Sequence, residues 1–476
     1  MVKSTLTPMF WALTPKPKSP KQPSPAFANS TPLVRHKASV NPTTPPPPPP
    51  SSAYIHLPFC RKRCHYCDFP ILALGSASTP DDPRLSNYVH HLCREITATK
   101  PHAHTPLQTV YFGGGTPSLV PPTLVSSVLE TLRAKFGIRE DAEISMEMDP
   151  GTFDAEKMRE MVVLGLNRVS LGVQAFQEEL LRACGRAHGV KEVLEAIRVV
   201  KSCGVRNWSI DLIASLPHQS SDMWEESLRL TVDSQPTHVS VYDLQIEQGT
   251  KFGRLYSPGE FPLPSETQSA EFYKMASRIL GDANYNHYEI SSYCKSGYEC
   301  KHNFTYWKNK PFYGFGLGST SFVGGLRFSR PRKVNDYFNF VQNLENGLVN
   351  SSGDGQIHGK DTAMDVVMLS LRTSQGLDLK CFQESFGSPI VLSLLEVYKP
   401  YVESGLVVCL DEHRKSIRVD DLNNTERKVV YMRLSDPEGF LLSNELIALA
   451  FGVIDSWNDC PSYQEAEATL KQEFIC

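Results

Sequence analysis

The sequence predicts an α/β protein in which a partial barrel of six strand–helix units precedes a small, mostly helical C-terminal domain. Three features predict this fold. Short β-rich runs alternate with amphipathic helical stretches between residues 54 and 244, which is typical of a parallel sheet with right-handed crossovers. Glycine and polar residues follow the predicted strands directly, at the rim where a β/α barrel carries its site. Beyond residue 360, helical patterns dominate.

The six predicted strands are runs rich in β-branched, aromatic and aliphatic residues. In chain order they are YIHL (54–57), TVYF (109–112), EISMEM (143–148), RVSLGV (168–173), WSIDLI (208–213) and VSVYDL (239–244). Helices are predicted between them, for example over 124–136, 155–164 and 190–202, with Asp154 as an N-cap. A doubly wound sheet is the alternative, but it would gather ligand contacts at one switch point, whereas here they follow strand after strand.

The leader, residues 1–50, differs from the rest of the chain in composition. It contains no Asp or Glu, is rich in Pro, Ser and Thr, and ends in six prolines. Such a segment cannot bury enough apolar surface to fold, so it is predicted to be a cleaved transit peptide or a disordered tail. We therefore expect an organellar protein, with the chloroplast stroma favoured over the mitochondrial matrix, or a cytoplasmic one if the leader is not cleaved.

Three further segments are expected after the leader. Residues 51–345 should form the barrel and an aromatic, glycine-rich segment, HNFTYWKNKPFYGFGLGSTSF, interpreted as ordered loops near a site. Residues 360–450 should form the C-terminal domain, with a hairpin around 404–419 that could make it winged, and residues 451–476 a tail. The net charge of −4 gives no sign of a nucleic-acid partner, and no apolar run is long enough to span a bilayer.

The strongest chemical signal is the segment IHLPFCRKRCHYCDFPI, residues 55–71. It places Cys60, Cys64 and Cys67 in a C-x3-C-x2-C pattern directly after the first predicted strand. A structural zinc site needs four ligands and usually two separated C-x2-C pairs, and the sequence has no second pair. A cubane 4Fe–4S cluster held by three thiolates leaves one iron open to a substrate or cofactor. The spacing therefore predicts a 4Fe–4S cluster.

Seven motifs, taken together, resemble one family. In chain order they are YIHLPFC, YFGGGTPSL, LGVQAF, GRAH, DLIASLP, YDLQIEQGT and HNFTYW, and the resemblance extends from about Tyr54 to past Asn444 of GFLLSNEL. With the cysteine pattern they resemble the radical S-adenosylmethionine (radical SAM) superfamily, in the branch that holds the coproporphyrinogen oxidase HemN and its relative HemW. The resemblance implies a radical SAM barrel, a HemN-type C-terminal domain, and SAM bound at the open iron, where it is cleaved to methionine and a deoxyadenosyl radical.

The resemblance also implies which residues bind the cofactors. Cys60, Cys64 and Cys67 would be the cluster ligands. The residues that would contact SAM lie at or just beyond strand ends, and they are Tyr54, Tyr66, Gly114, Gly115, Thr116, Glu147, Gln174, Arg186 and Asp211. Among them the glycine–threonine turn would approach the methionine amino group, Arg186 would face the methionine carboxylate, and the acidic and amide side chains would bind the amine or ribose. The structural alternatives are a cap or rim position for the carboxylates and a surface charge for Arg186; no catalytic residue is assigned.

Two functions compete within this branch. HemN decarboxylates coproporphyrinogen to protoporphyrinogen, whereas HemW binds haem and delivers it to haem-requiring partners. In this chain Asp68 and Phe69 follow Cys67 where the oxidase continues to a further cysteine, and the leader replaces an ordered N-terminal extension. The sequence therefore favours a haem chaperone and leaves enzymatic activity open. The oxidase and a cluster-bearing scaffold that never cleaves SAM are the alternatives.

Haem would be cargo, beside the cluster and SAM as cofactors. His302 of HNFTYW is either an axial ligand of the haem iron or a hydrogen-bonded histidine, and Cys294 and Cys300 offer alternative thiolate ligands. The expected partners are a haem or porphyrin ligand, haem-accepting client proteins, a reductant such as ferredoxin or flavodoxin, and a second copy of the chain in a homodimer.

Overall fold

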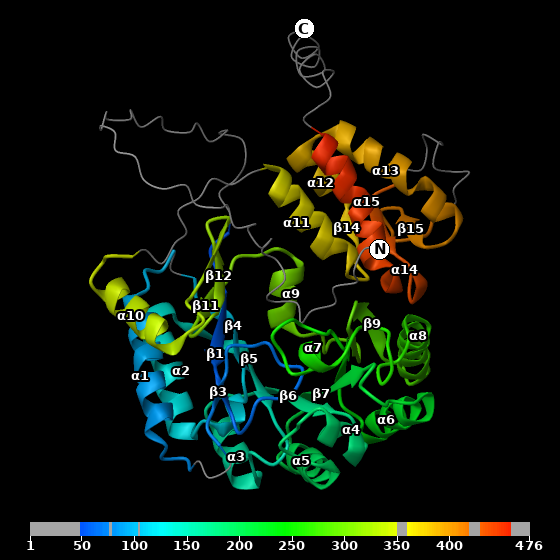
Figure 1. Ribbon diagram of the computed structural model, residues 1–476. Coiled ribbons are helices and arrows are strands. Elements are labelled where there is room, and N and C mark those ends of the chain that lie inside the picture. The colour runs from blue at the N-terminus through cyan, green and yellow to red at the C-terminus, as the bar shows by residue number, and fades with distance from the viewer. Residues whose placement is uncertain (1–47, 76–78, 103–104, 350–358, 418–428, 458–476) are drawn as a thin grey trace, which may run out of the picture.

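A computed structural model describes residues 48–75, 79–102, 105–349, 359–417 and 429–457. Within these ranges the chain forms a curved sheet wrapped by helices, and a second, smaller unit that sits on one end of it (Figure 1). The larger sheet has the strand order β11-β1-β4-β5-β6-β7-β8-β10-β9. Nearly all of the predicted leader, and the end of the predicted tail, lie outside the described residues.

All six predicted strands are present. They are β1 (Ser52–Leu57), β4 (Leu107–Gly114), β5 (Ile138–Met148), β6 (Arg168–Gln174), β7 (Asn207–Ala214) and β8 (His238–Asp243). Consecutive members pair in parallel, in the order in which they occur in the chain. The two outermost strands of the sheet, β11 and β9, do not pair with each other, so the barrel is open. The prediction of a partial barrel is confirmed.

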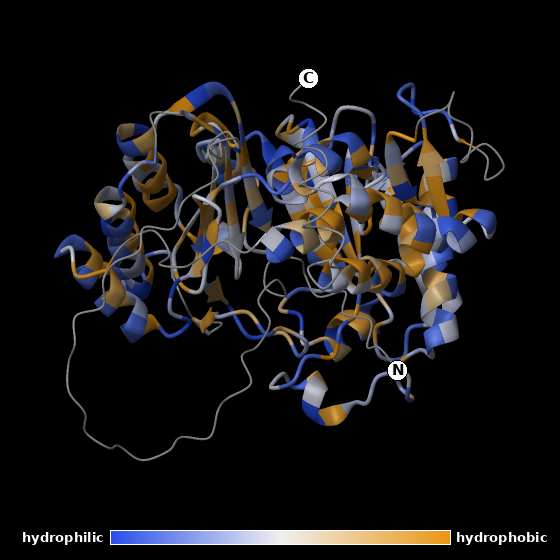
Figure 2. Ribbon diagram, turned by 90° about the horizontal axis from the view of Figure 1, so that it is seen from above, coloured by the Kyte–Doolittle hydropathy of each residue, from blue (hydrophilic) through white to orange (hydrophobic). Residues whose placement is uncertain are grey.

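Helices cover the outer face of this sheet. They are α1 (Pro83–Ala98), α2 (Pro122–Phe136), α3 (Ala155–Val163), α4 (Glu178–Ala183), α5 (Val190–Ser202), α6 (Ser221–Ser234) and α8 (Glu266–Asp282). Asp154 caps α3 as predicted, since its carboxylate accepts a hydrogen bond from the backbone N–H of Lys157. The outer helices carry hydrophobic residues on part of their surface and hydrophilic residues on the rest (Figure 2). Their apolar sides bury strand residues such as Val110 and Ile210 completely.

The aromatic, glycine-rich segment differs from the expectation of ordered loops. HNFTYW lies in a helix, α9 (Lys301–Trp307), because the Glu143 side chain accepts hydrogen bonds from the first backbone N–H groups of that helix. The following YGF forms β11 (Tyr313–Phe315), which pairs in parallel with β1 and extends the sheet. Three residues are too few to show the alternation that predicts a strand.

The remaining elements of the core are short or lie at its edges. They are β2 (Phe59–Cys60), β3 (Leu72–Ala73), η1 (Pro117–Leu119), α7 (Phe252–Leu255), β9 (Asn286–Glu289), β10 (Ser292–Cys294), β12 (Thr320–Val323), β13 (Leu326–Ser329) and α10 (Val334–Glu345). The strands β10 and β9 follow β8 in the sheet, pair in antiparallel fashion and form one of its two edges.

The smaller unit has its own hydrophobic core and is mostly helical. Its elements are α11 (Gly359–Leu371), β14 (Leu377–Asp378), α12 (Leu379–Phe386), α13 (Ser388–Glu403), β15 (Val407–Leu410), β16 (Tyr431–Leu434), α14 (Glu438–Leu441) and α15 (Ser443–Ser456). β16 lies between β14 and β15 in a small antiparallel sheet.

Two expectations for this unit need correction or qualification. The hairpin expected around 404–419 begins with β15 and turns back at Ser416, but the main partner of β15 is β16. The boundary expected at residue 450 falls inside α15, where Ile454 is fully buried, so the unit extends further than expected. No helix in the described ranges is both long enough and apolar enough to cross a membrane.

Candidate functional site at the strand ends

The inner face of the curved sheet is polar. Side chains alternate along each strand, so that apolar residues face the helices and every second residue faces inward. The inward-facing side chains include Ser52, Tyr54, His56, Thr109, Tyr111, Glu143, Ser145, Glu147, Arg168, Ser170, Gln174, Ser209, Asp211 and Ser240. A parallel sheet that is packed on both faces usually shows continuous apolar runs instead. The alternation therefore indicates that the inner face surrounds a polar site.

Several inner groups have no hydrogen-bond partner within the described part of the chain. They are Ser145 Oγ, Arg168 Nε, Gln174 Oε1 and Asn207 Oδ1, all buried. Ser145, Arg168 and Asn207 occupy one row across β5, β6 and β7. Since buried polar groups are nearly always hydrogen-bonded, this interior fits a polar occupant better than an empty core.

The three predicted cluster ligands lie on the loop that follows β1. Its ends are tied by two hydrogen bonds, from Leu72 N to Pro58 O at 2.7 Å and from Leu74 N to Cys60 O at 2.8 Å. The Cys60, Cys64 and Cys67 thiols are half-buried, and none forms a disulfide. Burial raises the pKa of Cys60 to about 12 and that of Cys67 to about 11. Without a metal these two thiols are therefore neutral, and binding iron would release their protons.

No three His, Cys, Asp or Glu side chains in the described ranges are grouped to hold a single metal ion. A cubane cluster makes a different demand, because each cysteine binds a separate iron. The chemistry of the donor set, three thiols on one short loop, fits an iron–sulfur cluster.

The turn after β4 packs directly against the cysteine loop. A Cβ atom at Gly114 would lie 2.5 Å from the His56 ring, and one at Gly115 would lie 2.6 Å from the Phe59 carbonyl oxygen. Gly114 also has a φ of +113°, which L-residues rarely adopt. Thr116 Oγ1 lies 3.6 Å from Cys60 Sγ. The turn therefore needs glycine to bring its backbone this close to the predicted cluster site.

Glu147 connects this turn to the sheet interior. Its carboxylate accepts hydrogen bonds from Gly114 N at 2.9 Å and from the Tyr111 hydroxyl at 3.2 Å. The Tyr111 ring stacks on Tyr54, with the ring centroids 6.2 Å apart. Burial raises the pKa of Glu147 to about 7, so this carboxyl group gains or loses its proton near neutral pH. The structure thus brings Tyr54, Glu147 and the glycine turn together.

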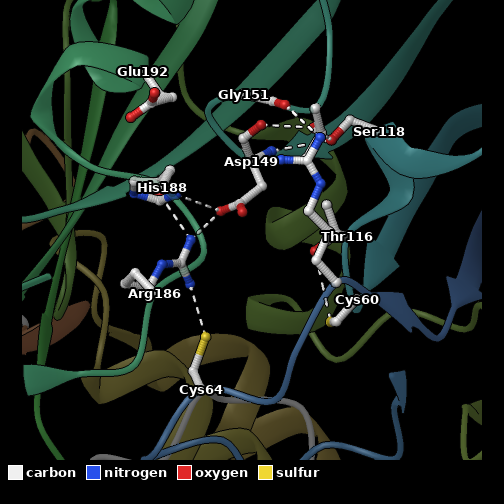
Figure 3. Close-up of polar contacts among 12 residues, drawn as sticks. Cys60, Cys64, Thr116, Ser118, Asp149, Gly151, Arg186, His188 and Glu192 are labelled. Carbon is white, nitrogen blue, oxygen red and sulfur yellow. Dashed lines mark hydrogen bonds and ion pairs between the residues drawn. The ribbon is translucent and has the colours of Figure 1, made fainter. Parts of the chain in front are cut away.

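Arg186 lies at the cysteine loop and not on the surface (Figure 3). Its guanidinium donates to Cys64 Sγ at 3.4 Å, to the Tyr66 hydroxyl at 3.0 Å and to the Gly172 carbonyl at 3.0 Å. It also forms an ion pair with Asp149, whose carboxylate lies 3.4 Å from His188 Nδ1. Burial would raise the pKa of Asp149, but Arg186 and His188 together hold it below its ordinary value.

Asp149 and His188 are site residues that the sequence interpretation missed. A signal for each was present, because Asp149 opens the DPGT turn directly after β5 and His188 is the histidine of GRAH. Figure 3 shows the Asp149 carboxylate between His188 and Arg186, and Arg186 reaching from there toward Cys64. Protein contacts alone therefore fix the orientation of Arg186.

Asp211 and Gln174 occupy the neighbouring strands. Asp211 is held by hydroxyl donors from Ser170 at 2.8 Å and Ser209 at 2.9 Å. Gln174 ends β6 with a φ of +70°, an unfavourable conformation for a residue other than glycine. Such strain gathers at functional positions, and the unpartnered Gln174 Oε1 adds to that indication.

His302 lies at the other end of the sheet interior, near the start of β4. Its Nδ1 contacts Thr109 Oγ1 at 2.6 Å and its Nε2 contacts the Tyr306 hydroxyl at 2.7 Å. Burial lowers its pKa to about 3, so the ring is neutral. Cys294 and Cys300 are also fully buried. Both ring nitrogens of His302 thus have hydrogen-bond partners, and its role as an axial haem ligand stays a prediction.

Comparisons with known proteins agree with this geometry. The radical SAM superfamily model matches residues 54–231, and the HemN C-terminal domain model matches residues 357–417. The protein named heme chaperone HemW from Synechocystis sp. is 38% identical, over 85% of this chain and 97% of its own length. The chain belongs to the HemW family.

Further HemW relatives and one solved structure extend the comparison. Heme chaperone HemW from Bacillus subtilis is 32% identical, over 75% of this chain and 92% of its own length. The structure of Escherichia coli HemN, described as coproporphyrinogen III oxidase and a radical SAM enzyme, superposes with a TM-score of 0.68 over 86% of this chain and 91% of that one. At 20% identity this match shows a shared fold.

Membership of the HemW family and the radical SAM superfamily implies a 4Fe–4S cluster and SAM, and the residues present fit both. The cysteine loop supplies three unpaired thiols, and the glycine turn leaves room for close approach to its backbone. Gln174 Oε1 supplies a buried acceptor without a protein partner in the described ranges.

Proposed function

We propose that this protein is a haem chaperone that holds a 4Fe–4S cluster on Cys60, Cys64 and Cys67, and SAM at the strand ends beside it. The observation that carries this proposal is the similarity to HemW, which spans 97% of the Synechocystis protein. The replacement of the oxidase's further cysteine by Asp68 and Phe69 supports it as well.

The residues of the site have distinct tasks in this proposal. When bound, the cluster supplies the electron that cleaves SAM reductively. Arg186 donates a hydrogen bond to the Cys64 sulfur and is held by its ion pair with Asp149, which His188 also contacts. Glu147 can accept or release a proton near neutral pH beside the glycine turn. The remaining contacts proposed for SAM, at Gln174 and Asp211, lie on the adjoining strands.

Two measurements test the proposal together: haem binding, and the conversion of coproporphyrinogen, which should not occur. Anaerobically reconstituted protein should bind about one haem per chain in a spectroscopic titration. The same protein, given coproporphyrinogen, SAM and a reductant, should not produce protoporphyrinogen. Conversion at catalytic rates would restore the oxidase, and a protein that bound SAM without cleaving it would support the scaffold alternative.

The location and the partners belong to the same proposal. A relative from Danio rerio, named radical S-adenosyl methionine domain-containing protein 1, mitochondrial, is 27% identical over 74% of this chain. We propose an organellar, homodimeric protein whose leader is removed and whose partners are haem-accepting clients and a reductant. N-terminal sequencing of the native protein should begin near residue 50, and an intact Met1 would contradict the cleaved leader.

A further inference from the structure

Three consecutive cations lie between the first two cysteines of the loop. They are Arg61, Lys62 and Arg63, and Lys62 and Arg63 are exposed. Arg61 donates to the Gly151 carbonyl at 2.7 Å, and Arg63 donates to the Cys67 and Phe69 carbonyls at 3.1 and 2.9 Å. The arginine side chains therefore lie along the cysteine loop itself.

Two distant segments add further cations to the same loop. Lys251 Nζ lies 3.1 Å from His65 Nε2, and Arg332 donates to the Asp68 carbonyl at 2.7 Å. Lys333 is the next residue along the chain and is exposed. We call this set the basic loop surface: Arg61, Lys62, Arg63, Lys251, Arg332 and Lys333.

Four cations of this surface are not paired with acids. In the described ranges Arg61, Lys62, Arg63 and Lys251 form no ion pair with a carboxylate, and Arg61 and Arg63 donate to carbonyl oxygens. The one acidic residue within the loop is Asp68. The whole chain carries a net charge of −4, so the concentration of cations here does not reflect a generally basic protein.

We propose that the basic loop surface is the docking site for an acidic protein that carries single electrons. The positive field would steer and orient a negatively charged partner. The loop beneath it holds the three half-buried thiols, so a redox group bound there would lie directly under the docked carrier. The carrier gives one electron to the cluster and leaves oxidised by one electron, and no other reactant is required. This inference rests on the proposed cluster but does not depend on haem binding.

The test uses anaerobically reconstituted full-length protein and a reduced, acidic plant-type [2Fe–2S] ferredoxin as the probe, without SAM or haem. The dissociation constant should rise steeply between about 50 and about 300 mM salt, because exposed charges become screened. The double variant Lys62→Glu, Lys333→Glu should bind the ferredoxin at least about tenfold more weakly and accept electrons more slowly. Both side chains are exposed and make no hydrogen bond in the described structure, so iron content should not change.

The matched control is Lys310→Glu. Lys310 is exposed and precedes β11, which runs parallel to β1, so it lies at the opposite end of the sheet from the cysteine loop. This variant should bind ferredoxin as the wild type does. Equal affinities for the double variant and the wild type, or binding that is insensitive to salt, would overturn the proposal. A protein that binds ferredoxin but no haem would refute the chaperone function alone.

Discussion

At the scale of single residues, Glu147 shows how neighbours set the properties of one side chain. Its carboxylate lies inside the curved sheet, where Gly114 N and the Tyr111 hydroxyl donate to it. Desolvation outweighs both donors, and the pKa rises from 4.5 to about 7. A cofactor amine at the turn would reverse this balance, because a cation favours the ionised carboxylate.

We predict that Glu147→Gln stabilises the cofactor-free protein at neutral pH. A carboxyl group whose folded pKa is raised contributes stability that is fully present below the unfolded pKa and is lost as pH rises through the folded value. The wild type should therefore lose up to about 3 kcal/mol relative to the variant between pH 4.5 and pH 7. Urea unfolding of both proteins at pH 4.5 and pH 8 measures this difference, and a difference that did not change with pH would show that Glu147 is not desolvated.

We predict that His302→Ala lowers stability and leaves the Soret band of bound haem unchanged. The substitution removes both ring hydrogen bonds and the stacking of the imidazole on Tyr111, at a cost of about 2 to 4 kcal/mol. Thermal unfolding and a haem titration measure the two effects. The control is His413→Ala, an exposed position that should change neither. A shifted Soret band with unaltered stability would make His302 the haem ligand after all.

At the scale of elements, the glycine turn and the cysteine loop depend on each other. We predict that Gly115→Ala lowers the iron content after reconstitution, because its Cβ would lie 2.6 Å from the Phe59 carbonyl oxygen and displace the loop. The contact is with backbone, so no side-chain rotation can relieve it, and we expect about 1 to 3 kcal/mol of lost stability.

The matched control for this change is Gly281→Ala. Gly281 lies in α8 with nothing within 4 Å of the position that its Cβ would take. Alanine should therefore stabilise that helix by about 0.5 to 1 kcal/mol and leave iron binding intact. Full iron content in the Gly115 variant, measured with the same protocol, would show that the turn does not constrain the loop.

The sequence predicted the strands well because each has an apolar outer face with a clear period of two. The same period of two located the strand ends at which most of the predicted site residues lie. The sequence interpretation missed α9 because that helix has few residues and is fixed by Glu143, which is far away in the chain. Asp149 and His188 were missed because Asp149 meets Arg186 and His188 only once the turn after β5 packs against the segment that follows α4.

At the scale of the whole molecule, the C-terminal unit is joined to the barrel through a few specific contacts. Figure 1 shows α9 between the sheet and α11. The backbone links Ile290 N to Arg372 O and Ser374 N to Tyr288 O, each at 3.0 Å. These contacts lie at the end of the barrel that carries His302. The C-terminal unit therefore covers the end of the barrel that is opposite the cysteine loop.

We predict that Asp436→Asn weakens this junction. Asp436 Oδ1 accepts from the Ser277 hydroxyl at 3.1 Å and contacts His287 Nδ1 at 2.7 Å, which ties the start of α14 to α8 and β9. Burial would raise the pKa of Asp436, but His287 and Ser277 hold it below its ordinary value. The stability that this carboxylate contributes is therefore present above its unfolded pKa and is lost as pH falls through the folded value.

The variant should lose about 1 to 3 kcal/mol of unfolding free energy at pH 7 relative to the wild type, and the difference should shrink as the pH falls below 3.8. Urea unfolding followed by tryptophan fluorescence measures it. The control, Asp455→Asn on the exposed side of α15, should unfold as the wild type does. Because the C-terminal unit has its own core, loss of the junction should also separate one unfolding transition into two. A single transition with unchanged midpoint would show that the other contacts, among them the Arg327–Asp365 ion pair and the apolar cluster of Ile290, Trp307 and Leu369, suffice to join the two units.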